Sequence, residues 1–281
     1  MSAHFVIPAP ATGPFPLGPD SQRQPSVPCG TLTRHLWRST IFPGTVRDYW
    51  VSVPAQYTPD KPANVMVFQD GLRFQDVAGQ MRVPVVFDNL IHQGRLPVTI
   101  GIYLDPGNFP GLPPVVPPWQ TAAEARNREF EYTMLTDQYA RFLLDEILPE
   151  VGRSYNLTQS AAGRAVCGAS NGGLCAFTVA WERPDAFSKV FSQVGAFVNF
   201  NGAHNYPPLI RRTPRRPIRV FLQTGTHDLE IQAGNFTLAN LEMAAALDFA
   251  GYDYRFAYGD GDHGLEHGGA ILPAVLEWLW R

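Results

Sequence analysis

Residues 164–177 read RAVCGASNGGLCAF, and this pattern predicts a strand that turns directly into a helix, with Ser170 at the junction in a G-x-S-x-G sequence. Such a reversal forces the turn residue into strained dihedral angles, and side chains two positions away would collide with the packed backbone. Gly168, Gly172 and Gly173 remove that collision. We therefore predict that the Ser170 hydroxyl projects from a sharp turn as a nucleophile. A helix-capping serine in an ordinary glycine-rich turn is the alternative.

Strand-like and helix-like runs alternate on both sides of this junction. Apolar runs predict strands at 47–54, 63–71, 97–107, 187–195, 217–225 and 254–261, and helical patterns lie at 83–94, 133–151, 171–183, 235–252 and 268–281. Buried strands that alternate with helices imply right-handed crossovers, so we predict an α/β fold with a mostly parallel central sheet and helices on both faces. In such sheets, reactive groups gather at the carboxyl ends of the strands.

Composition limits the classes of function. A chain of 281 residues with 45% hydrophobic content fits one sizeable domain, which we place at 30–281 after a proline-rich extension at 1–29. The net charge of −3 gives no broad basic face, which argues against nucleic acid as a partner. Three cysteines, none in a C-x-x-C pair, suggest neither a disulfide framework nor a metal site. The sequence does not decide between a monomer and a homo-oligomer.

Two proline-rich stretches interrupt the pattern. The first thirty residues lack a positive region followed by an apolar run, and no window approaches 18 unbroken apolar residues. We therefore expect a soluble, cytoplasmic protein with no membrane partner. Residues 105–120 contain PGNFPGLPPVVPPWQ, which is too rich in proline for a regular element and predicts a long surface loop that could act as a lid.

A serine nucleophile needs a base and a group that orients the base. In this architecture they follow later in the chain, acid first and histidine last, each at the carboxyl end of a later strand. The strand IRVFLQTG runs into Asp228, and the strand YRFAYGDG runs into His263. We predict these two residues as the acid and the base. Glu230 is an alternative acid, and His267 or His227 is an alternative base.

The stretch GDGDHGLEHGG, residues 259–269, also matches the zinc-protease pattern H-x-x-E-H. Zinc binding would require His263 and His267 to lie one helical turn apart on one face of a helix. The glycines of this window each disfavour a helix by roughly 1 kcal/mol relative to alanine. Downstream of His267, Glu277 is the sole carboxylate or histidine. We therefore predict a loop here, with no metal and no cofactor.

Acyl transfer also requires donors for the negative charge that builds on the carbonyl oxygen. One candidate is the backbone N–H of Asn171, immediately after the nucleophile. The other is the N–H of Leu72, in the loop VFQDGLRF, where Gly71 allows a tight turn. A plain Asp-Gly turn without a catalytic role is the alternative for this loop.

Several segments together resemble the esterase branch of the α/β-hydrolases, the group that contains enterochelin-esterase-like proteins, esterase D and the feruloyl esterases. The resemblance covers 30–281, and its carriers are FPGTVRDYWVSVPAQY, VFQDG, VVFDNLIHQG, NREFEY, CGASNGG, FTVAWERPDAFSKV, FLQTGTHDLE and GDHGLEHGGAILPAVLEWLW. It implies an α/β-hydrolase fold, with Ser170 as nucleophile, Asp228 as acid, His263 as base, and Leu72 and Asn171 as oxyanion donors. The large separate amino-terminal domain of enterochelin esterase has no counterpart here, which argues against siderophore hydrolysis.

We therefore expect a serine carboxylic-ester hydrolase that forms an acyl-enzyme with a small-molecule ester. Two alternatives remain: an acyltransferase with the same triad, and a non-catalytic binding protein on the same fold. Aromatic residues outside the predicted helices and strands suggest that the substrate carries an aryl or feruloyl-type group; they are Phe109, Trp119, Phe197, Phe200 and Tyr206. Scattered surface or core aromatic residues without a role in binding are the alternative.

Overall fold

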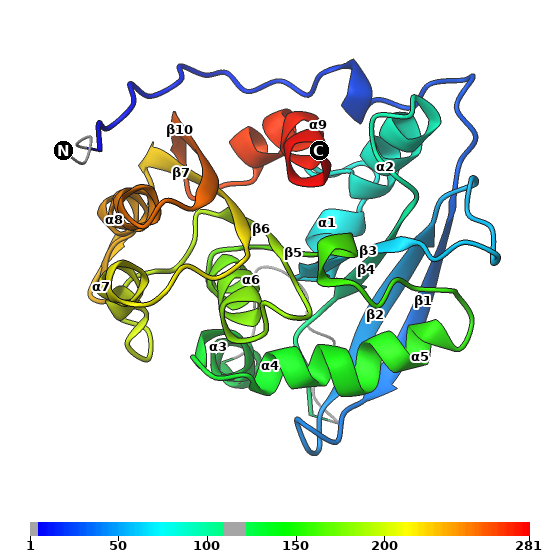
Figure 1. The fold of residues 1–281 in the computed structure, drawn as a ribbon, viewed down its shortest axis with the longest axis horizontal. Helices are drawn as coiled ribbons and strands as arrows, with labels where there is room; N and C mark the ends of the chain where they lie inside the picture. Colours follow the sequence, from blue (N-terminus) through cyan, green and yellow to red (C-terminus); the bar gives the residue numbers. More distant parts are fainter. Residues whose placement is uncertain (1–4, 110–121) are drawn as a thin grey trace.

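The computed structural model of the chain describes residues 5–109 and 122–281, and within them a single large sheet organises the fold (Figure 1). Its strand order is β1-β2-β4-β3-β5-β6-β7-β10. The strands are β1 (Thr31–Arg38), β2 (Val46–Val53), β3 (Asn64–Gln69), β4 (Thr99–Leu104), β5 (Arg164–Ala169), β6 (Lys189–Gln193), β7 (Arg219–His227) and β10 (Asp253–Asp262). β1 and β2 pair in antiparallel fashion, and all pairs from β4 to β10 are parallel. The predicted mostly parallel sheet is confirmed.

Helices cover both faces of this sheet, as the sequence predicts (Figure 1). One face packs against α1 (Gly71–Gln75), α2 (Val83–His92) and α9 (Glu266–Trp280), and the other against α3 (Ala122–Thr133), α6 (Asn171–Glu182), α7 (Tyr206–Arg212) and α8 (Phe236–Phe249). Side chains of β3 alternate between the two cores: Val65 and Val67 join one, while Met66 and Phe68 join the other. A strand that is buried on both faces explains the unbroken apolar run in its sequence.

The predicted helix at 133–151 differs from the observed one. Thr133 ends α3, and a new helical stretch begins only at Gln138, as α4 (Gln138–Arg141), a π-helical turn (Phe142–Ile147) and α5 (Leu148–Gly152). Pro149 explains the irregularity, because proline has no N–H for the carbonyl group of Asp145 four residues earlier. The apolar spacing was correct for 138–151, and the first turn was wrong.

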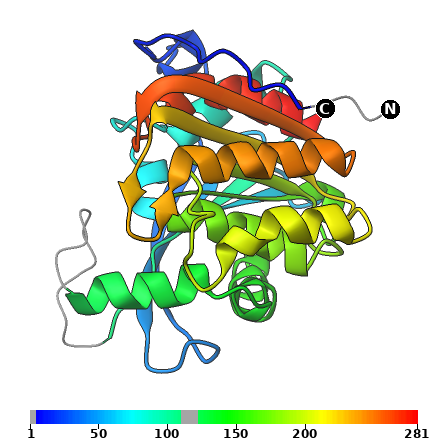
Figure 2. The same cartoon turned by 90° about the vertical axis from the view of Figure 1, so that its left-hand side faces the viewer.

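The amino-terminal segment, defined here as residues 5–30, lies on the surface of the domain (Figure 2). At one end Ala11 pairs with Gly259 of β10. Farther along, the segment forms a short 3-10 helix (Pro19–Ser21) and reaches α2, where the side-chain amide of Asn89 donates to the carbonyl groups of Asp20 and Gln22 at 2.8 Å each. These contacts tie the segment to β10 at one end and to α2 at the other.

Two other structural expectations concern loops and membranes. Most of the proline-rich stretch predicted as a loop lies outside the described residues, which end at 109 and resume at 122. Within those described ranges, none of the helices is both long and apolar enough to cross a lipid bilayer.

Candidate active site

Ser170 occupies a strained turn between β5 and α6. Its φ of 58° and ψ of −125° are a conformation that non-glycine residues rarely adopt. The neighbouring glycines make the turn sterically feasible: a Cβ atom on Gly168 would lie 2.3 Å from the carbonyl oxygen of Gly172, and one on Gly173 would lie 2.7 Å from Ser192 Oγ. The predicted sharp turn is therefore present, for the predicted reason.

Backbone hydrogen bonds fix this turn from two sides. The N–H of Ser170 donates to the carbonyl oxygen of Gln193 at the end of β6 (3.0 Å), and its own carbonyl oxygen accepts from Ala196 (3.1 Å) and Leu174 (3.1 Å). The side chain of Ser170 is half-buried, and its hydroxyl makes no hydrogen bond within the described residues. The hydroxyl is therefore available to a substrate and is not used as a helix cap.

Asp228 and His263 form a short hydrogen bond. Asp228 follows β7, its side chain is fully buried, and its Oδ1 lies 2.5 Å from Nδ1 of His263, which follows β10. Thr224 Oγ1 donates to Asp228 Oδ2 (2.6 Å) and the N–H of Leu229 donates to Oδ1 (2.8 Å), so the carboxylate is held in one orientation. A carboxylate at Nδ1 favours the tautomer that carries its proton there and leaves Nε2 as an acceptor.

The three predicted triad residues follow strands that run in the same direction. Ser170 follows β5, Asp228 follows β7 and His263 follows β10, and β5, β6, β7 and β10 are parallel neighbours in that order. All three therefore lie at the same edge of the sheet. The described residues contain the Asp228–His263 hydrogen bond and no bond between Ser170 and His263. Catalytic hydrogen bonds are often long in free enzymes and shorten when substrate binds.

The alternative residues for the acid and the base have other surroundings. Glu230 is exposed on the two-residue strand β8 (Glu230–Ile231). His227 is exposed, and its Nδ1 lies 2.9 Å from the carbonyl oxygen of Asp260. His267 is buried; its Nδ1 lies 3.3 Å from Gln223 Nε2 and its ring stacks on Phe15. The hydrogen bond between a carboxylate and a histidine at this sheet edge joins Asp228 and His263, and none of these three residues takes part in it.

The zinc-like pattern HGLEH is only partly a loop. β10 extends to Asp262 and α9 begins at Glu266, so His263 precedes the helix and His267 lies in its first turn. The prediction of a loop through 269 was wrong, because the glycines at 268 and 269 pack closely against Gln193 and Gln80 and are tolerated inside the helix. The two histidines do not share a helix face. Among the described residues no group of three or more potential ligands could hold a metal ion.

Of the two predicted oxyanion donors, one N–H group already has a hydrogen-bond acceptor and the other has none within its helix. Asn171 is the first residue of α6, ahead of the first intrahelical bond from Leu174 to Ser170, so its N–H has no acceptor within the helix. The N–H of Leu72, near the start of α1, instead donates to Oδ1 of Asp105 at 3.0 Å. Burial raises the pKa of Asp105 to about 7, and the Leu72 N–H opposes this shift.

Three features of this site were not predicted. Thr224 orients Asp228, and Phe236, the first residue of α8, contacts the His263 ring edge-on with 5.1 Å between ring centres. Asp70 has a φ of 56° and is held by Arg128 through two hydrogen bonds of 2.8 and 2.6 Å, which fixes the turn that leads to Leu72. Among these features, Thr224 alone has a local signal in the sequence, because it lies four residues before the predicted acid.

The aromatic residues singled out in the sequence fall into different environments. Phe197 and Tyr206 are buried and pack around Phe177, so they belong to the core. Trp119 lies outside the described residues, and Phe109 is 45% exposed. Phe200 is half-buried and packs on Phe236, with 6.5 Å between ring centres. Of the four that lie in the described residues, Phe200 is the one connected by ring contacts to His263, through Phe236.

Comparison with known proteins places the chain in a family. A family model described as "Putative esterase" matches residues 43–274. A protein of Bacillus subtilis (strain 168), described as "Uncharacterized protein YjcH", is 24% identical over 232 residues, which are 81% of this chain and 88% of that protein. The family match covers most of the domain and contains all five of the predicted site residues.

Solved structures share the fold. The enterobactin esterase FES of Shigella flexneri superposes with a TM-score of 0.73 at 21% identity over 94% of this chain, which spans 63% of the length of FES. The ferulic acid esterase AmCE1/Fae1A of the anaerobic fungus Anaeromyces mucronatus gives a TM-score of 0.69 at 19% identity, with 92% of this chain and 93% of that chain covered. The predicted α/β-hydrolase fold and resemblance to the esterase branch are confirmed.

Proposed function

Because the chain belongs to the family described as "Putative esterase", we propose that it hydrolyses carboxylic esters through an acyl-enzyme intermediate on Ser170. The observation that carries this proposal is the 2.5 Å hydrogen bond from His263 Nδ1 to the buried carboxylate of Asp228, at the sheet edge that also holds the strained Ser170 turn. It supplies the oriented base that a serine nucleophile requires.

In the first half-reaction, Ser170 Oγ attacks the carbonyl carbon of the ester while Nε2 of His263 accepts the hydroxyl proton. Asp228 holds the imidazole in the tautomer with an unprotonated Nε2 and stabilises the imidazolium that forms. The tetrahedral intermediate collapses, the bond to the alcohol oxygen breaks, and His263 returns the proton to the leaving alcohol. Ser170 then carries the acyl group as an ester.

The second half-reaction repeats these steps with water. His263 accepts a proton from water as its oxygen attacks the acyl carbon, and then returns that proton to Ser170 Oγ as the carboxylic acid leaves. The N–H groups of Asn171 and Leu72 stabilise both oxyanions in this proposal. The Asp105 carboxyl group must then give up its 3.0 Å contact with the Leu72 N–H when the oxyanion forms.

Kinetics with p-nitrophenyl acetate test the triad. We expect Ser170→Ala and His263→Ala to lower kcat by about 10³-fold or more, and Asp228→Asn by about 10²–10⁴-fold, because the triad acts as a unit. Glu230→Gln and His227→Gln are matched controls, since both residues are exposed neighbours of the same acid, and neither should change kcat. Undiminished turnover by Ser170→Ala would refute the proposal.

We further propose an ester with an aryl group, of the feruloyl type, as substrate. Two observations support this choice: Phe236 packs edge-on against the His263 ring and the half-buried Phe200 packs on Phe236, and the similar structures include an enzyme described as a ferulic acid esterase in complex with ferulic acid. Comparison of methyl ferulate with methyl butyrate tests it. We expect a higher kcat/KM for the ferulate, and Phe200→Ala should reduce that preference. Equal kcat/KM values would exclude an aryl-selective site.

A further inference from the structure

The loop that carries His263 is short, and it follows an irregular part of β10 that is still paired with β7 at Asp262. Residues 263–265 alone connect β10 to α9. The pairing of β10 with β7 changes register between Gly259 and Asp262, so the end of β10 departs from the regular ladder. The Asp228 bond and the Phe236 ring hold the imidazole itself, and contacts outside the sheet help to hold the backbone on either side of it. One stretch of the amino-terminal segment, residues 11–15, supplies such contacts at both ends of the loop.

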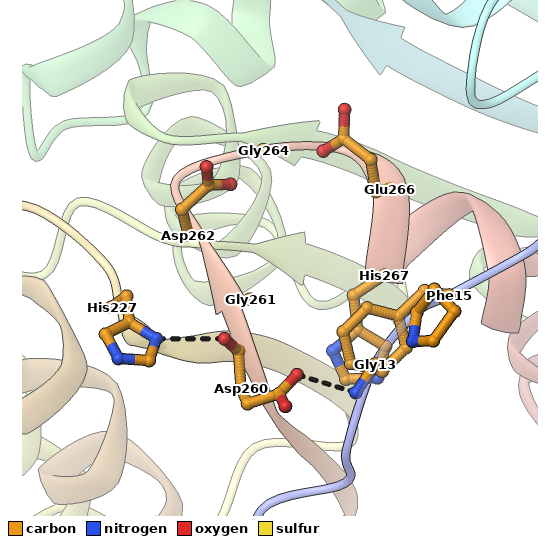
Figure 3. A pocket seen from close by; sticks show the side chains of 10 residues that line it. Gly13, Phe15, His227, Asp260, Gly261, Asp262, Gly264, Glu266 and His267 are labelled. Atoms are coloured by element: carbon orange, nitrogen blue, oxygen red, sulfur yellow. Dashed lines mark hydrogen bonds between the residues drawn. The ribbon is translucent and has the colours of Figure 1, made fainter.

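The first set of contacts fixes the end of β10. The N–H of Ala11 donates to the carbonyl oxygen of Tyr258 (2.8 Å), and its carbonyl oxygen accepts from the N–H of Asp260 (2.9 Å). Two residues farther along, the N–H of Gly13 donates to Oδ1 of Asp260 at 2.7 Å (Figure 3). Three hydrogen bonds thus hold the strand immediately before the His263 loop.

The second contact fixes the start of α9. The ring of Phe15 stacks on His267 with 4.1 Å between ring centres and 14° between the planes (Figure 3). Gly259 leaves room for this stack, because a Cβ atom there would lie 2.6 Å from His267 Nδ1 and 2.8 Å from Phe15 Cζ. His267 is four residues after His263 in the chain, so the stack holds the other end of the same loop.

The two contacts are separate. An open pocket of about 590 Å³ lies between the amino-terminal segment and the loop, lined by Asp262 and Glu266 among others. The segment therefore does not pack along the loop, and these two contacts are with Asp260 before it and His267 after it. The Gly13–Asp260 side-chain bond and the Phe15–His267 stack can accordingly each be removed by one substitution outside the loop, while the two backbone bonds of Ala11 remain.

We propose that Gly13 and Phe15, bound to Asp260 and His267, form a clasp that positions the His263 loop for proton transfer from Ser170. The clasp rests on the proposed function, because it takes His263 to be the base. Its four members are positioning residues, since they act through the loop and make no contact with the reacting atoms. His267, the second histidine of HGLEH, therefore acts in this clasp as the partner of Phe15.

Phe15→Ala and Asp260→Ala test the clasp at its two contacts. We expect each to lower kcat for p-nitrophenyl acetate and the rate of labelling by a fluorophosphonate by about tenfold, because both reactions need the same proton transfer. KM should change by less than about twofold, because the clasp does not contact the substrate. Phe15→Tyr keeps the ring and Asp260→Asn keeps an acceptor, so these variants should retain kcat.

Asn89→Ala is the control for general loosening of the same segment, since Asn89 holds its other end through two hydrogen bonds to backbone carbonyls. This variant should keep kcat. The low-field proton resonance of His263 Nδ1 provides an independent readout: it should stay sharp in Asn89→Ala and broaden in Phe15→Ala and Asp260→Ala.

Each remaining outcome has a definite meaning. If Phe15→Ala and Asp260→Ala keep kcat, or if Asn89→Ala lowers it equally, the clasp is refuted. If Ser170→Ala is inactive in the same assay, the proposed function survives that refutation. If Ser170→Ala stays fully active, the proposed function fails, and the clasp fails with it.

Discussion

Asp105 is a buried carboxylic acid next to the predicted oxyanion donor Leu72. Burial raises its pKa from the usual value of 3.8 to about 7; the Leu72 N–H and Arg47 lower the pKa, and the nearby carboxylates of Asp70 and Asp48 raise it further. In the unfolded chain this group would ionise near pH 4. Between about pH 4 and pH 7 the folded protein therefore binds more protons at Asp105 than the unfolded chain.

The sign of the resulting pH dependence follows. Asp105 makes the free energy of unfolding fall as pH rises from about 4 to about 7. Above about pH 7 the group is ionised in both states, so it adds no further pH dependence to the free energy of unfolding. Asp105→Asn should therefore flatten this fall and stabilise the protein at about pH 8 by on the order of 1–4 kcal/mol, since the amide oxygen can still accept from Leu72. Urea unfolding between about pH 5 and pH 8 measures the effect. The exposed Asp145→Asn is the control, and a profile identical to that of wild type would contradict the prediction.

The residues of the candidate site were predictable to different degrees. The place of Ser170 in the turn between strand and helix was predicted from a local pattern, and the places of Asp228 and His263 after later strands were predicted from chain order. Asp105 and Phe236 were missed, because their roles depend on contacts between segments far apart in sequence. Asp105 accepts a hydrogen bond from the N–H of Leu72, which lies 33 residues earlier, and no local pattern marks such a pair.

At the scale of elements, the junction of β5 and α6 is tightly constrained by its backbone. A Cβ atom on Gly168 would lie 2.3 Å from the carbonyl oxygen of Gly172, which is backbone and cannot move aside cheaply. The two elements can therefore approach only where one of them carries no side chain. Asp70, which follows β3, also has a positive φ, but its ψ of 52° places it in the left-handed helical region, unlike Ser170.

Gly168→Ala should separate β5 from α6. We expect the free energy of unfolding to fall by about 1–3 kcal/mol, and kcat to fall by about tenfold or more as Ser170 shifts. Gly152→Ala is the matched control: a Cβ atom there meets nothing within 4 Å, so stability and kcat should change little. Wild-type activity and stability in Gly168→Ala would show that the turn does not depend on this glycine.

Elements with strong periodicity were predicted well, and irregular ones were not. The sequence located β2 to β7 and α2, α6 and α8 within a few residues, because apolar runs and glycine stops mark them. It missed β1, where exposed and half-buried side chains alternate on an edge strand. It also missed the turn between α3 and α4, because the apolar spacing continues through residues 134–137 while the backbone does not.

At the scale of the whole molecule, a buried ion pair joins distant parts of the chain. Arg47 of β2 and Glu131 of α3 are fully buried and make two hydrogen bonds of 2.7 and 2.9 Å, although 84 residues separate them. Glu131 also accepts from the N–H of Gly107. The pair thus connects the antiparallel side of the sheet to α3 and to the segment that follows β4.

Removal of one partner should be far more costly than removal of both. Arg47→Met leaves the Glu131 carboxylate buried without its cation and should lower the free energy of unfolding by about 3–5 kcal/mol. The double variant Arg47→Met/Glu131→Leu should recover part of that loss. Arg34→Gln, which breaks the exposed pair with Asp48, should cost less than about 1 kcal/mol. Guanidinium unfolding measures all three, and equal losses in Arg47→Met and Arg34→Gln would contradict the account.

The layer architecture followed from the alternation of strands and helices, but the path of the amino-terminal segment did not. Prolines prevent regular structure there. Gly13 contacts Asp260 and Phe15 contacts His267, and about 250 residues separate the partners in each pair. Such contacts depend on the folded surface of β10 and α9. Composition therefore predicted an extension and could not predict where it binds.

The central claim is that Ser170 is the nucleophile, and covalent labelling tests it most directly. The protein is treated with a p-nitrophenyl phosphonate ester, digested, and mapped by mass spectrometry. We expect a single adduct on the peptide that contains Ser170, with loss of esterase activity in proportion to labelling and little adduct in His263→Ala. An unmodified Ser170 in protein that has lost its activity, or an adduct on another residue that accounts for the loss, would contradict the account.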